Sequence, residues 1–181
     1  MASELYRIEN GKINLSLHPG QAQAWRSEAR FVAIIAGTQS GKTSFLPWWL
    51  WREIGRRGSG DYIAATASYD LFKLKMLPAI REVFEHVLRR GRYWASDRIV
   101  ELSDEEGRFR ARAASDPMWG RIILRSAAAG GGLESATAKA AVLDEAGQDE
   151  FGVEDWEAVL RRLSLSQGRV LLGTTPYNMG W

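Results

Sequence analysis

The sequence contains no cysteine, so disulfide bonds and metal sites built on thiolate ligands are both excluded. It has only two histidines, His18 and His86, and neither stands at metal-ligand spacing from a partner, so we expect structural roles for both. No apolar run approaches the roughly 18 residues that a membrane-spanning helix needs. The first residues also lack the apolar stretch of a signal peptide. We therefore expect a cytoplasmic protein without a membrane partner.

The residues that are present indicate an ordinary globular domain. The 181 residues suit one domain with a full core, and 45% hydrophobic and 25% charged residues are usual proportions. The net charge of +2 is too small to indicate nucleic-acid binding by itself. Basic residues exceed acidic ones before residue 126 and the reverse holds after it, but a mixed, solvated surface would give the same pattern.

Short apolar runs alternate with amphipathic segments along the chain. The apolar runs predict buried strands at residues 31–36, 62–67, 122–125, 140–143 and 169–172. Helical periodicity predicts helices at residues 42–54, 71–88 and 154–165. Strands that alternate with helices predict an α/β fold, with a mostly parallel sheet and helices on both faces.

Several local features refine this prediction. Residues 98–113 alternate in polarity around the turn SDEEG and predict a β-hairpin, and residues 127–132 (AAAGGG) predict a loop. A proline is tolerated only in the first turns of a helix, so Pro47 should lie early in its helix and Pro78 should kink the next one. Three tryptophans in the first of these helices are expected in the core or an interface: Trp48, Trp49 and Trp51.

The strongest functional signal is AGTQSGKT at residues 36–43, directly between a predicted strand and a predicted helix. Backbone N–H groups of such a loop and of the helix start converge on phosphate oxygens, and Gly41 lets the backbone come close. Lys42 can reach the β- and γ-phosphates, and the Thr43 hydroxyl can bind Mg²⁺. The flanking elements disfavour a chance Gly/Ser turn. The segment therefore predicts a site for ATP and Mg²⁺ formed by Ala36, Gly37, Thr38, Gln39, Ser40, Gly41, Lys42 and Thr43.

The strand at residues 140–143 delivers Asp144 and Glu145 at its end, where α/β sheets place ligand sites. We predict that Asp144 holds Mg²⁺ through water and that Glu145 orients and polarises the attacking water, with Lys42 as the other catalytic group. A surface turn is the alternative. The acidic residue after the aspartate indicates a P-loop ATPase of the additional-strand, catalytic-glutamate type. The last strand ends in GTTP, where a polar residue can report on the γ-phosphate, unless it is a plain strand exit.

Four segments resemble the large terminase subunit of tailed viruses and stand in the order of that family: LHPGQAQAW (17–25), AGTQSGKT (36–43), LESATAKAAVLDEA (133–146) and LLGTTP (171–176). The resemblance is to the N-terminal ATPase domain, the motor that couples ATP hydrolysis to movement of double-stranded DNA into a viral procapsid. It implies work in the cytoplasm of an infected host cell, with the viral portal and the small terminase subunit as partners. It also implies a homo-oligomeric ring when the motor is active.

The resemblance also implies roles for single residues. Gln21 matches the family's adenine-reading glutamine best, with Gln23 second and a solvent-facing helical glutamine as the alternative. Thr174 and Thr175 match its coupling motif. Many members have arginine at the places of Thr38 and of a residue near Glu134, and this sequence does not. The arginine finger is therefore sought elsewhere, with Arg125 as the first candidate and Lys139 as the second.

The family also carries a C-terminal nuclease domain, but no acidic cluster follows the coupling motif here. We therefore expect residues 1–181 to form a single ATPase domain without a nuclease site. Two other functions stay open. One is a helicase- or translocase-like, DNA-dependent ATPase outside the terminases. The other is a nucleotide-binding module with little turnover, which Lys42 and Glu145 disfavour.

Overall fold

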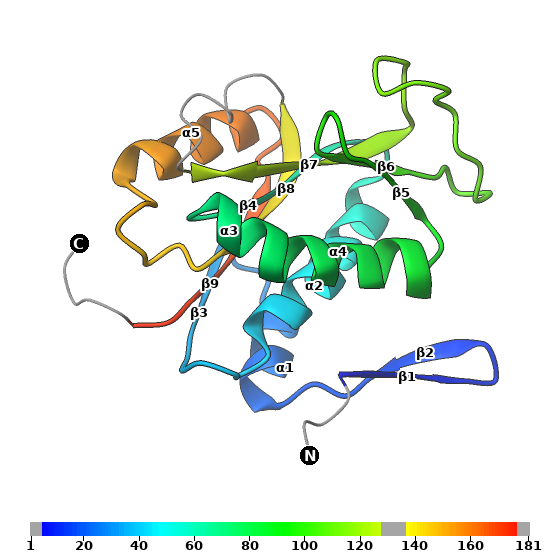
Figure 1. The fold of residues 1–181 in the computed structure, drawn as a ribbon. Helices are drawn as coiled ribbons and strands as arrows, with labels where there is room; N and C mark the ends of the chain where they lie inside the picture. The colour runs from blue at the N-terminus through cyan, green and yellow to red at the C-terminus, as the bar shows by residue number, and fades with distance from the viewer. Residues whose placement is uncertain (1–4, 128–136, 177–181) are drawn as a thin grey trace.

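A seven-stranded sheet forms the centre of the computed structural model, which describes residues 5–127 and 137–176 (Figure 1). Its strand order is β3-β9-β8-β4-β7-β6-β5. The first five strands are parallel, and β6 is antiparallel to both of its neighbours, β7 and β5. In that order the strands are Phe31–Ile35, Arg169–Thr174, Ala138–Asp144, Gly60–Thr66, Gly120–Ser126, Ile99–Leu102 and Gly91–Trp94. The predicted α/β fold with a mainly parallel sheet is confirmed, and β9 lies between β3 and β8.

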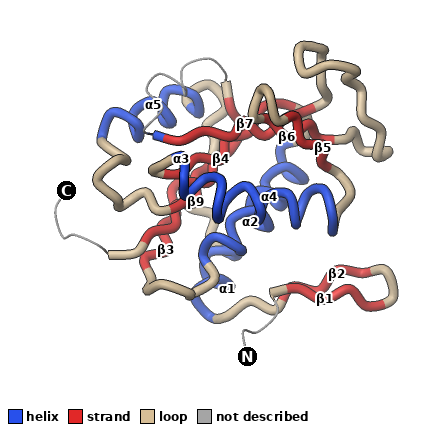
Figure 2. The backbone as a smooth tube through the Cα atoms, in the orientation of Figure 1, coloured by secondary structure: helices blue, strands red, loops and turns tan. Residues whose placement is uncertain are grey.

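Helices cover both faces of this sheet (Figure 2). One face carries α1 (Pro19–Arg26), α2 (Lys42–Arg57) and a longer helical segment, and the other carries α5 (Val153–Leu163). The longer segment runs through α3 (Tyr69–Leu71), the π-helical turn η1 (Phe72–Met76), α4 (Leu77–Arg81) and the π-helical turn η2 (Glu82–Val87). Within the described ranges no helix is both long and apolar enough to cross a membrane.

The side chains of the central strands alternate between two cores, because successive residues of a strand face opposite sides of the sheet. Tyr62 and Ala64 pack against α2 and the helical segment, whereas Ile63 and Ala65 pack against α5. Trp48 and Trp49 are 3% and 0% exposed in the first of these cores, which confirms the predicted position of these tryptophans. Burial on both faces explains why these strands appear in the sequence as continuous apolar runs.

The helical predictions are confirmed with shifts at their ends. Pro47 lies in the second turn of α2, which continues to Arg57 rather than ending at residue 54. The helix predicted at residues 71–88 begins at Tyr69, and it is not a uniform α-helix, because π-helical turns lie on both sides of α4. Pro78 stands in the first turn of α4, where its missing N–H interrupts the regular ladder.

The predicted hairpin at residues 98–113 is wrong. The strand β6 pairs with the preceding β5 and with β7, and residues 103–119 form no strand. The reason is the buried carboxylate of Glu101, which accepts hydrogen bonds from the backbone N–H groups of Arg110 and Ala111 at 2.9 Å each. A side chain thus satisfies the backbone that a second strand would have paired. The turn holds because the Asp104 carboxylate accepts from the N–H groups of Glu106 and Arg108.

The structure also contains a second, two-stranded sheet that the sequence patterns did not predict. Strands β1 (Tyr6–Glu9) and β2 (Lys12–Leu15) form a hairpin that lies beside α2 and α4, apart from the main sheet (Figure 1). Of the loop predicted at residues 127–132, only Ala127 is among the described residues.

Candidate nucleotide site

The phosphate-loop sequence joins the end of β3 to the start of α2, as predicted. Gly41 precedes the helix with φ 76° and ψ 15°, a left-handed conformation that glycine adopts without strain. A β-carbon at Gly41 would also stand 3.2 Å from the Gln21 amide nitrogen. The Ala36 N–H donates to the carbonyl oxygen of Thr174 at 3.1 Å, so the loop begins in contact with the end of β9.

The ammonium group of Lys42 folds back into the loop. It donates to the carbonyl oxygens of Ala36 at 2.7 Å and Gly37 at 2.9 Å, and to the Ser40 hydroxyl at 3.3 Å. It also reaches the Thr175 hydroxyl at 3.2 Å, which links the loop to the segment after β9. Lys42 is only 5% exposed, so a cation is held at the centre of the loop with polar oxygens around it.

The two predicted magnesium ligands meet. The Thr43 hydroxyl donates to Asp144 Oδ2 at 2.8 Å, from the first turn of α2 to the end of β8. Asp144 is 1% exposed, and its second oxygen, Oδ1, is buried without a hydrogen-bond partner among the described residues. Burial raises the pKa of Asp144 to about 6, and the nearby charge of Glu145 adds to this, against the hydrogen bond from Thr43. A buried carboxylate oxygen with an unsatisfied lone pair fits a cation better than it fits an empty interior.

Glu145 follows Asp144 in a left-handed backbone conformation, with φ 53°. Its carboxylate accepts a hydrogen bond from the Thr175 N–H at 3.3 Å, so Thr175 contacts both Lys42 and Glu145. The neighbouring Thr174 hydroxyl accepts from the Gly147 N–H at 2.9 Å, and a β-carbon at Gly147 would stand 2.6 Å from that hydroxyl. The end of β9 is therefore packed tightly between the phosphate loop and the acidic pair.

Gln21 lies against the phosphate loop, whereas Gln23 is exposed. The Gln21 amide nitrogen donates to the carbonyl oxygen of Gly41 at 3.3 Å, and its oxygen accepts from the His18 N–H at 3.2 Å. His18 in turn caps α1 and contacts the carbonyl oxygen of Ser40 at 3.2 Å through its ring. The expected structural role of His18 is thus visible, and the position of Gln21 distinguishes it from Gln23.

A cleft of about 920 Å³ opens over these residues. The predicted residues that line it are Gln21, Thr38, Gln39, Ser40, Gly41, Lys42, Thr43 and Glu145. The sequence did not predict that Lys75, from η1, lines the same cleft. The amphipathic pattern put Lys75 on the polar side of a helix. A pattern within one helix does not show which of its solvent-facing residues lies near the phosphate loop.

The two candidates for the arginine finger lie outside this cleft. Arg125, on β7, donates from its guanidinium to the carbonyl oxygens of Leu124 at 2.8 Å and Asp97 at 3.4 Å. Partial burial lowers the pKa of Arg125, and the charges of Arg98 and Arg121 add to this. Lys139 lies at the opposite end of β8 from Asp144, where it donates to the carbonyl oxygen of Arg57 at 2.8 Å. Glu134 falls outside the described residues.

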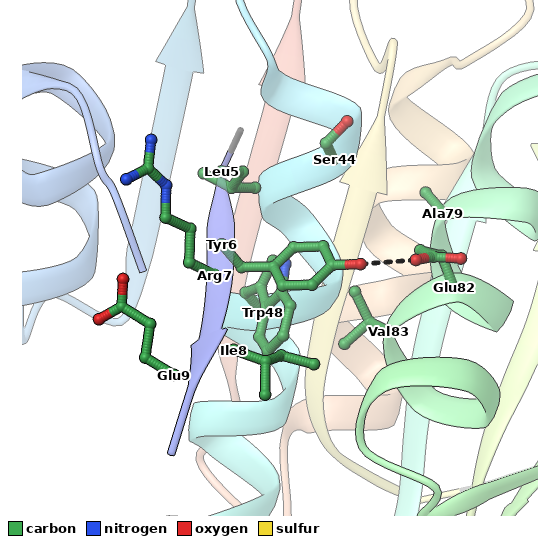
Figure 3. A pocket seen from close by; sticks show the side chains of 10 residues that line it. All are labelled: Leu5, Tyr6, Arg7, Ile8, Glu9, Ser44, Trp48, Ala79, Glu82 and Val83. Atoms are coloured by element: carbon green, nitrogen blue, oxygen red, sulfur yellow. Dashed lines mark hydrogen bonds between the residues drawn. The ribbon is translucent and has the colours of Figure 1, made fainter. Parts of the chain in front are cut away.

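A second cavity of about 670 Å³ adjoins the cleft and shares Leu5 and Ser44 with it. Figure 3 shows Tyr6 of β1 reaching over Trp48 toward the neighbouring helical segment, while Arg7 and Glu9 point to the other side of the strand. The Tyr6 hydroxyl donates to Glu82 at 2.7 Å, and its ring centroid lies 5.3 Å from that of Trp48. The hairpin thereby forms one wall beside the nucleotide cleft.

The donor set agrees with a magnesium ion that is held mostly by water and phosphate. Among residues 5–127 and 137–176, no group of three or more histidine, aspartate or glutamate side chains could hold a metal by itself. Thr43 and Asp144 together supply a hydroxyl and a carboxylate. Mg²⁺ keeps several waters and takes one or two protein oxygens plus substrate phosphates at sites of this kind.

No model of a protein family and no curated protein matched the chain. Solved structures did match it. The large terminase ATPase domain of Thermus phage P74-26 is 23% identical, with a TM-score of 0.69 over 92% of this chain and 68% of that one. The large terminase of a thermophilic bacteriophage, solved in complex with ATP-γ-S, is 10% identical, with a TM-score of 0.65 over 86% and 37%. The HK97 bacteriophage large terminase is 13% identical, with a TM-score of 0.62 over 96% and 36%.

These identities are low, so the likeness concerns the fold. This chain spans well under half of the ATP-γ-S-bound terminase and of the HK97 protein, and about two thirds of the P74-26 domain. This chain shares with these proteins the architecture of a mostly parallel sheet with helices on both faces. Its cleft lies at the carboxyl edge of that sheet. The chain thus has the fold of the ATPase domain of phage large terminases.

Proposed function

We propose that this chain binds Mg²⁺·ATP at residues 36–43 and hydrolyses it, as the motor that moves double-stranded DNA into a viral procapsid. The observation that carries the ATPase proposal is the meeting of three segments that lie far apart in the sequence. Lys42, Asp144 and Thr175 come from the phosphate loop, β8 and the end of β9, and hydrogen bonds join the three segments. The terminase fold and the solved ATP-γ-S complex of a terminase with this fold support the same assignment.

The strand order supports the additional-strand, catalytic-glutamate class of P-loop ATPases. The strand β9 lies between β3, which leads into the phosphate loop, and β8, which ends at Asp144. This insertion separates the phosphate loop from the acidic pair by one strand. The gap leaves room for Glu145 to face the γ-phosphate across the cleft, and it places Thr174 and Thr175 between the two.

Hydrolysis then follows from the chemistry of phosphoryl transfer, in which positioning and charge stabilisation dominate. Lys42 leaves its loop carbonyls and contacts the β- and γ-phosphates. Glu145 accepts a proton from a water molecule, whose oxygen bonds to the γ-phosphorus. The bond from that phosphorus to the β–γ bridging oxygen breaks, and its electron pair stays on ADP. Thr43 and Asp144 would hold Mg²⁺, which would supply positive charge to the phosphate oxygens.

Thr175 is suited to couple this reaction to movement. It contacts Lys42 through its hydroxyl and Glu145 through its N–H. A γ-phosphate that draws Lys42 to itself, and an attacking water that takes the Glu145 carboxylate as its acceptor, would loosen both contacts. Thr174 and Thr175 follow β9 directly, and the end of that strand would shift in response. In the proposed motor this shift is transmitted to the DNA, within a ring of subunits that engages the portal and the small terminase subunit. We propose no nuclease activity for these residues.

The test of the ATPase proposal is ATP binding and turnover by the chain, with Lys42→Ala as the matched variant. We expect Mg²⁺-dependent ATP binding by the unsubstituted chain and a loss of binding in Lys42→Ala, because a cation desolvated against phosphate is removed. Unchanged ATP affinity in that variant would remove residues 36–43 as the site.

The packaging proposal is tested separately from the ATPase proposal. Procapsids that carry a portal should stimulate ATP turnover and protect DNA from added nuclease. Stimulation by DNA alone, without any effect of portal and procapsid, would instead indicate a helicase- or translocase-like ATPase.

A further inference from the structure

The nucleotide cleft contains a second cation, which comes from outside the phosphate loop. Lys75 lies in the π-helical turn η1 and lines the cleft together with Lys42, Thr43 and Glu145. Its neighbours Phe72 and Met76 are buried in the core, at 3% and 2% exposure. These two side chains fix the turn against the sheet, so the Lys75 backbone is anchored while its side chain remains exposed.

The charge of Lys75 has no partner of opposite charge within residues 5–127 and 137–176. Within the described part of the chain it makes no hydrogen bond and no ion pair, whereas Lys42 is surrounded by four oxygen acceptors. Lys75 nevertheless lines the same cleft as Glu145, which follows Asp144 directly, and as Lys42 and Thr43. An unpaired ammonium group thus faces the place where the acidic pair and the phosphate loop meet.

The local backbone also marks this position. A π-helical turn is less favourable than an α-helical one and occurs preferentially at functional sites, because it changes the direction in which side chains leave the helix. The preceding lysine of the same turn, Lys73, shows the contrast. Its ammonium group lies 4.7 Å from the ring centroid of Tyr69 and does not line the cleft. Two exposed lysines two residues apart therefore have different surroundings, and only one belongs to the site.

We propose that Lys75 is a phosphate-binding residue in cis, which contacts the γ-phosphate of ATP on the side where Glu145 holds the attacking water. This inference rests on the proposed ATPase function and deepens it. During hydrolysis the bond from water oxygen to the γ-phosphorus forms while the bond to the bridging oxygen breaks, and negative charge gathers on the γ-phosphoryl oxygens and the leaving ADP. An ammonium group beside those oxygens stabilises that charge. Such a group is needed from elsewhere, because the loop has Thr38 and no cation before Lys42.

The proposal distinguishes ATP from ADP, because only ATP has the phosphate that Lys75 would contact. The experiment measures the affinities of the full chain for Mg²⁺·ATP-γ-S and Mg²⁺·ADP, together with ATP turnover, in three variants. In Lys75→Met we expect ATP-γ-S affinity to fall about tenfold or more while ADP affinity stays within about twofold, since a charged hydrogen bond is lost only to the γ-phosphate. Turnover should fall by about 10²-fold. Lys75→Arg keeps the charge and should restore most of both.

Lys73→Met is the matched control, because it removes another exposed lysine from the same turn. It should leave both affinities and turnover unchanged. Equal effects of Lys75→Met and Lys73→Met on ATP-γ-S affinity would overturn the role of Lys75, and so would an equal loss of ADP and ATP-γ-S affinity. If the unsubstituted chain binds ATP-γ-S and Lys42→Ala does not, such a result removes only Lys75. Absence of ATP-γ-S binding by the unsubstituted chain would overturn the proposed function and this role together.

Discussion

The Thr43 hydroxyl and the Asp144 carboxylate form a hydrogen bond of 2.8 Å between residues that lie 101 positions apart in the sequence. This bond joins the first turn of α2, which lines the nucleotide cleft through Thr43, to the end of β8. It satisfies one carboxylate oxygen and leaves the other, Oδ1, buried and without a partner among the described residues. A charge held in this way destabilises the nucleotide-free protein and becomes favourable when a cation arrives.

The first prediction concerns Asp144→Asn, which keeps the shape and removes the charge. Burial raises the pKa of Asp144 from 3.8 to about 6, so the native state binds this proton more tightly than the unfolded state. Stability is then lost as pH rises from about 4 through about 6, by an upper limit of about 3 kcal/mol. In EDTA the variant should therefore be more stable than the unsubstituted chain at pH 8, with the difference vanishing near pH 4.

Urea unfolding between pH 4 and pH 8 measures this difference. Mg²⁺·ADP should reverse this difference, because the unsubstituted chain offers the metal a carboxylate ligand and the variant does not. Equal stabilities of the two proteins at pH 8 in EDTA would show that Asp144 carries no buried charge.

The second prediction concerns Glu145→Gln. The amide oxygen can still accept the hydrogen bond from the Thr175 N–H, so the local structure should be kept. The group that takes the proton from water is lost, and turnover should fall by about 10²-fold or more while ATP binding is retained. Steady-state turnover and equilibrium binding check the two parts. Glu150→Gln, in an exposed residue of the following turn, is the control, and turnover near the original level in Glu145→Gln would assign the catalytic carboxylate elsewhere.

The third prediction concerns the reading of adenine by Gln21. In Gln21→Glu the carboxylate oxygen can still accept from the His18 N–H, which preserves the start of α1, but the amide donor is lost. Adenine presents both a donor and an acceptor edge, so we expect the preference for ATP over GTP to fall by about tenfold, the effect of one hydrogen bond. Competition between ATP and GTP measures it, and the ratio cancels the added charge. Gln23→Glu should not change the preference for ATP over GTP. Equal preferences in the two variants would show that Gln21 does not contact the adenine.

Local pattern was sufficient to predict where the phosphate-loop segment and the acidic pair stand relative to the strands and helices. Strand, glycine-containing loop and helix follow one another in the sequence, and the strand that ends in Asp144 is buried on both faces, so both segments could be placed from residue order alone. The contacts that connect them could not be predicted from residue order. The contact of Thr175 with Lys42 spans 133 positions, and Lys75 enters the cleft from another helix.

The same limit explains the wrong hairpin and the missed stabilising contacts. Residues 108–113 alternate like a strand, but the buried Glu101 side chain accepts the backbone hydrogen bonds of Arg110 and Ala111, and no periodicity contains that information. The buried ion pair between Glu53 and Arg169, at 2.6 Å, likewise joins α2 to β9 across 116 positions. In each case the deciding interaction is a charged side chain whose partner is fixed only when the sheet has formed.

The last prediction concerns assembly and the arginine finger. Arg125 is held by the carbonyl oxygens of Leu124 and Asp97 in its own chain and does not line the nucleotide cleft. If it acts, it acts on a neighbouring subunit, and the isolated chain should hydrolyse ATP weakly. A finger is worth about 10³–10⁵ in rate, so turnover per subunit should rise steeply with protein concentration as rings form. Arg125→Ala should keep ATP binding and lose this rise in turnover with concentration. Arg98→Ala is the control for a neighbouring arginine, because the Arg98 guanidinium lies 4.7 Å from the Tyr69 ring centroid.

Mixing two inactive variants separates action in trans from action in cis. Arg125→Ala subunits have an intact nucleotide cleft, and Glu145→Gln subunits have an intact Arg125. In a mixed ring, an Arg125→Ala cleft receives Arg125 from a Glu145→Gln neighbour, so activity should return at ring-forming concentrations although each variant alone is inactive. Lys139→Ala paired with Glu145→Gln gives the same test for the second candidate. A flat, low activity curve for the unsubstituted chain, with no recovery in either mixture, would refute a finger supplied by a neighbour.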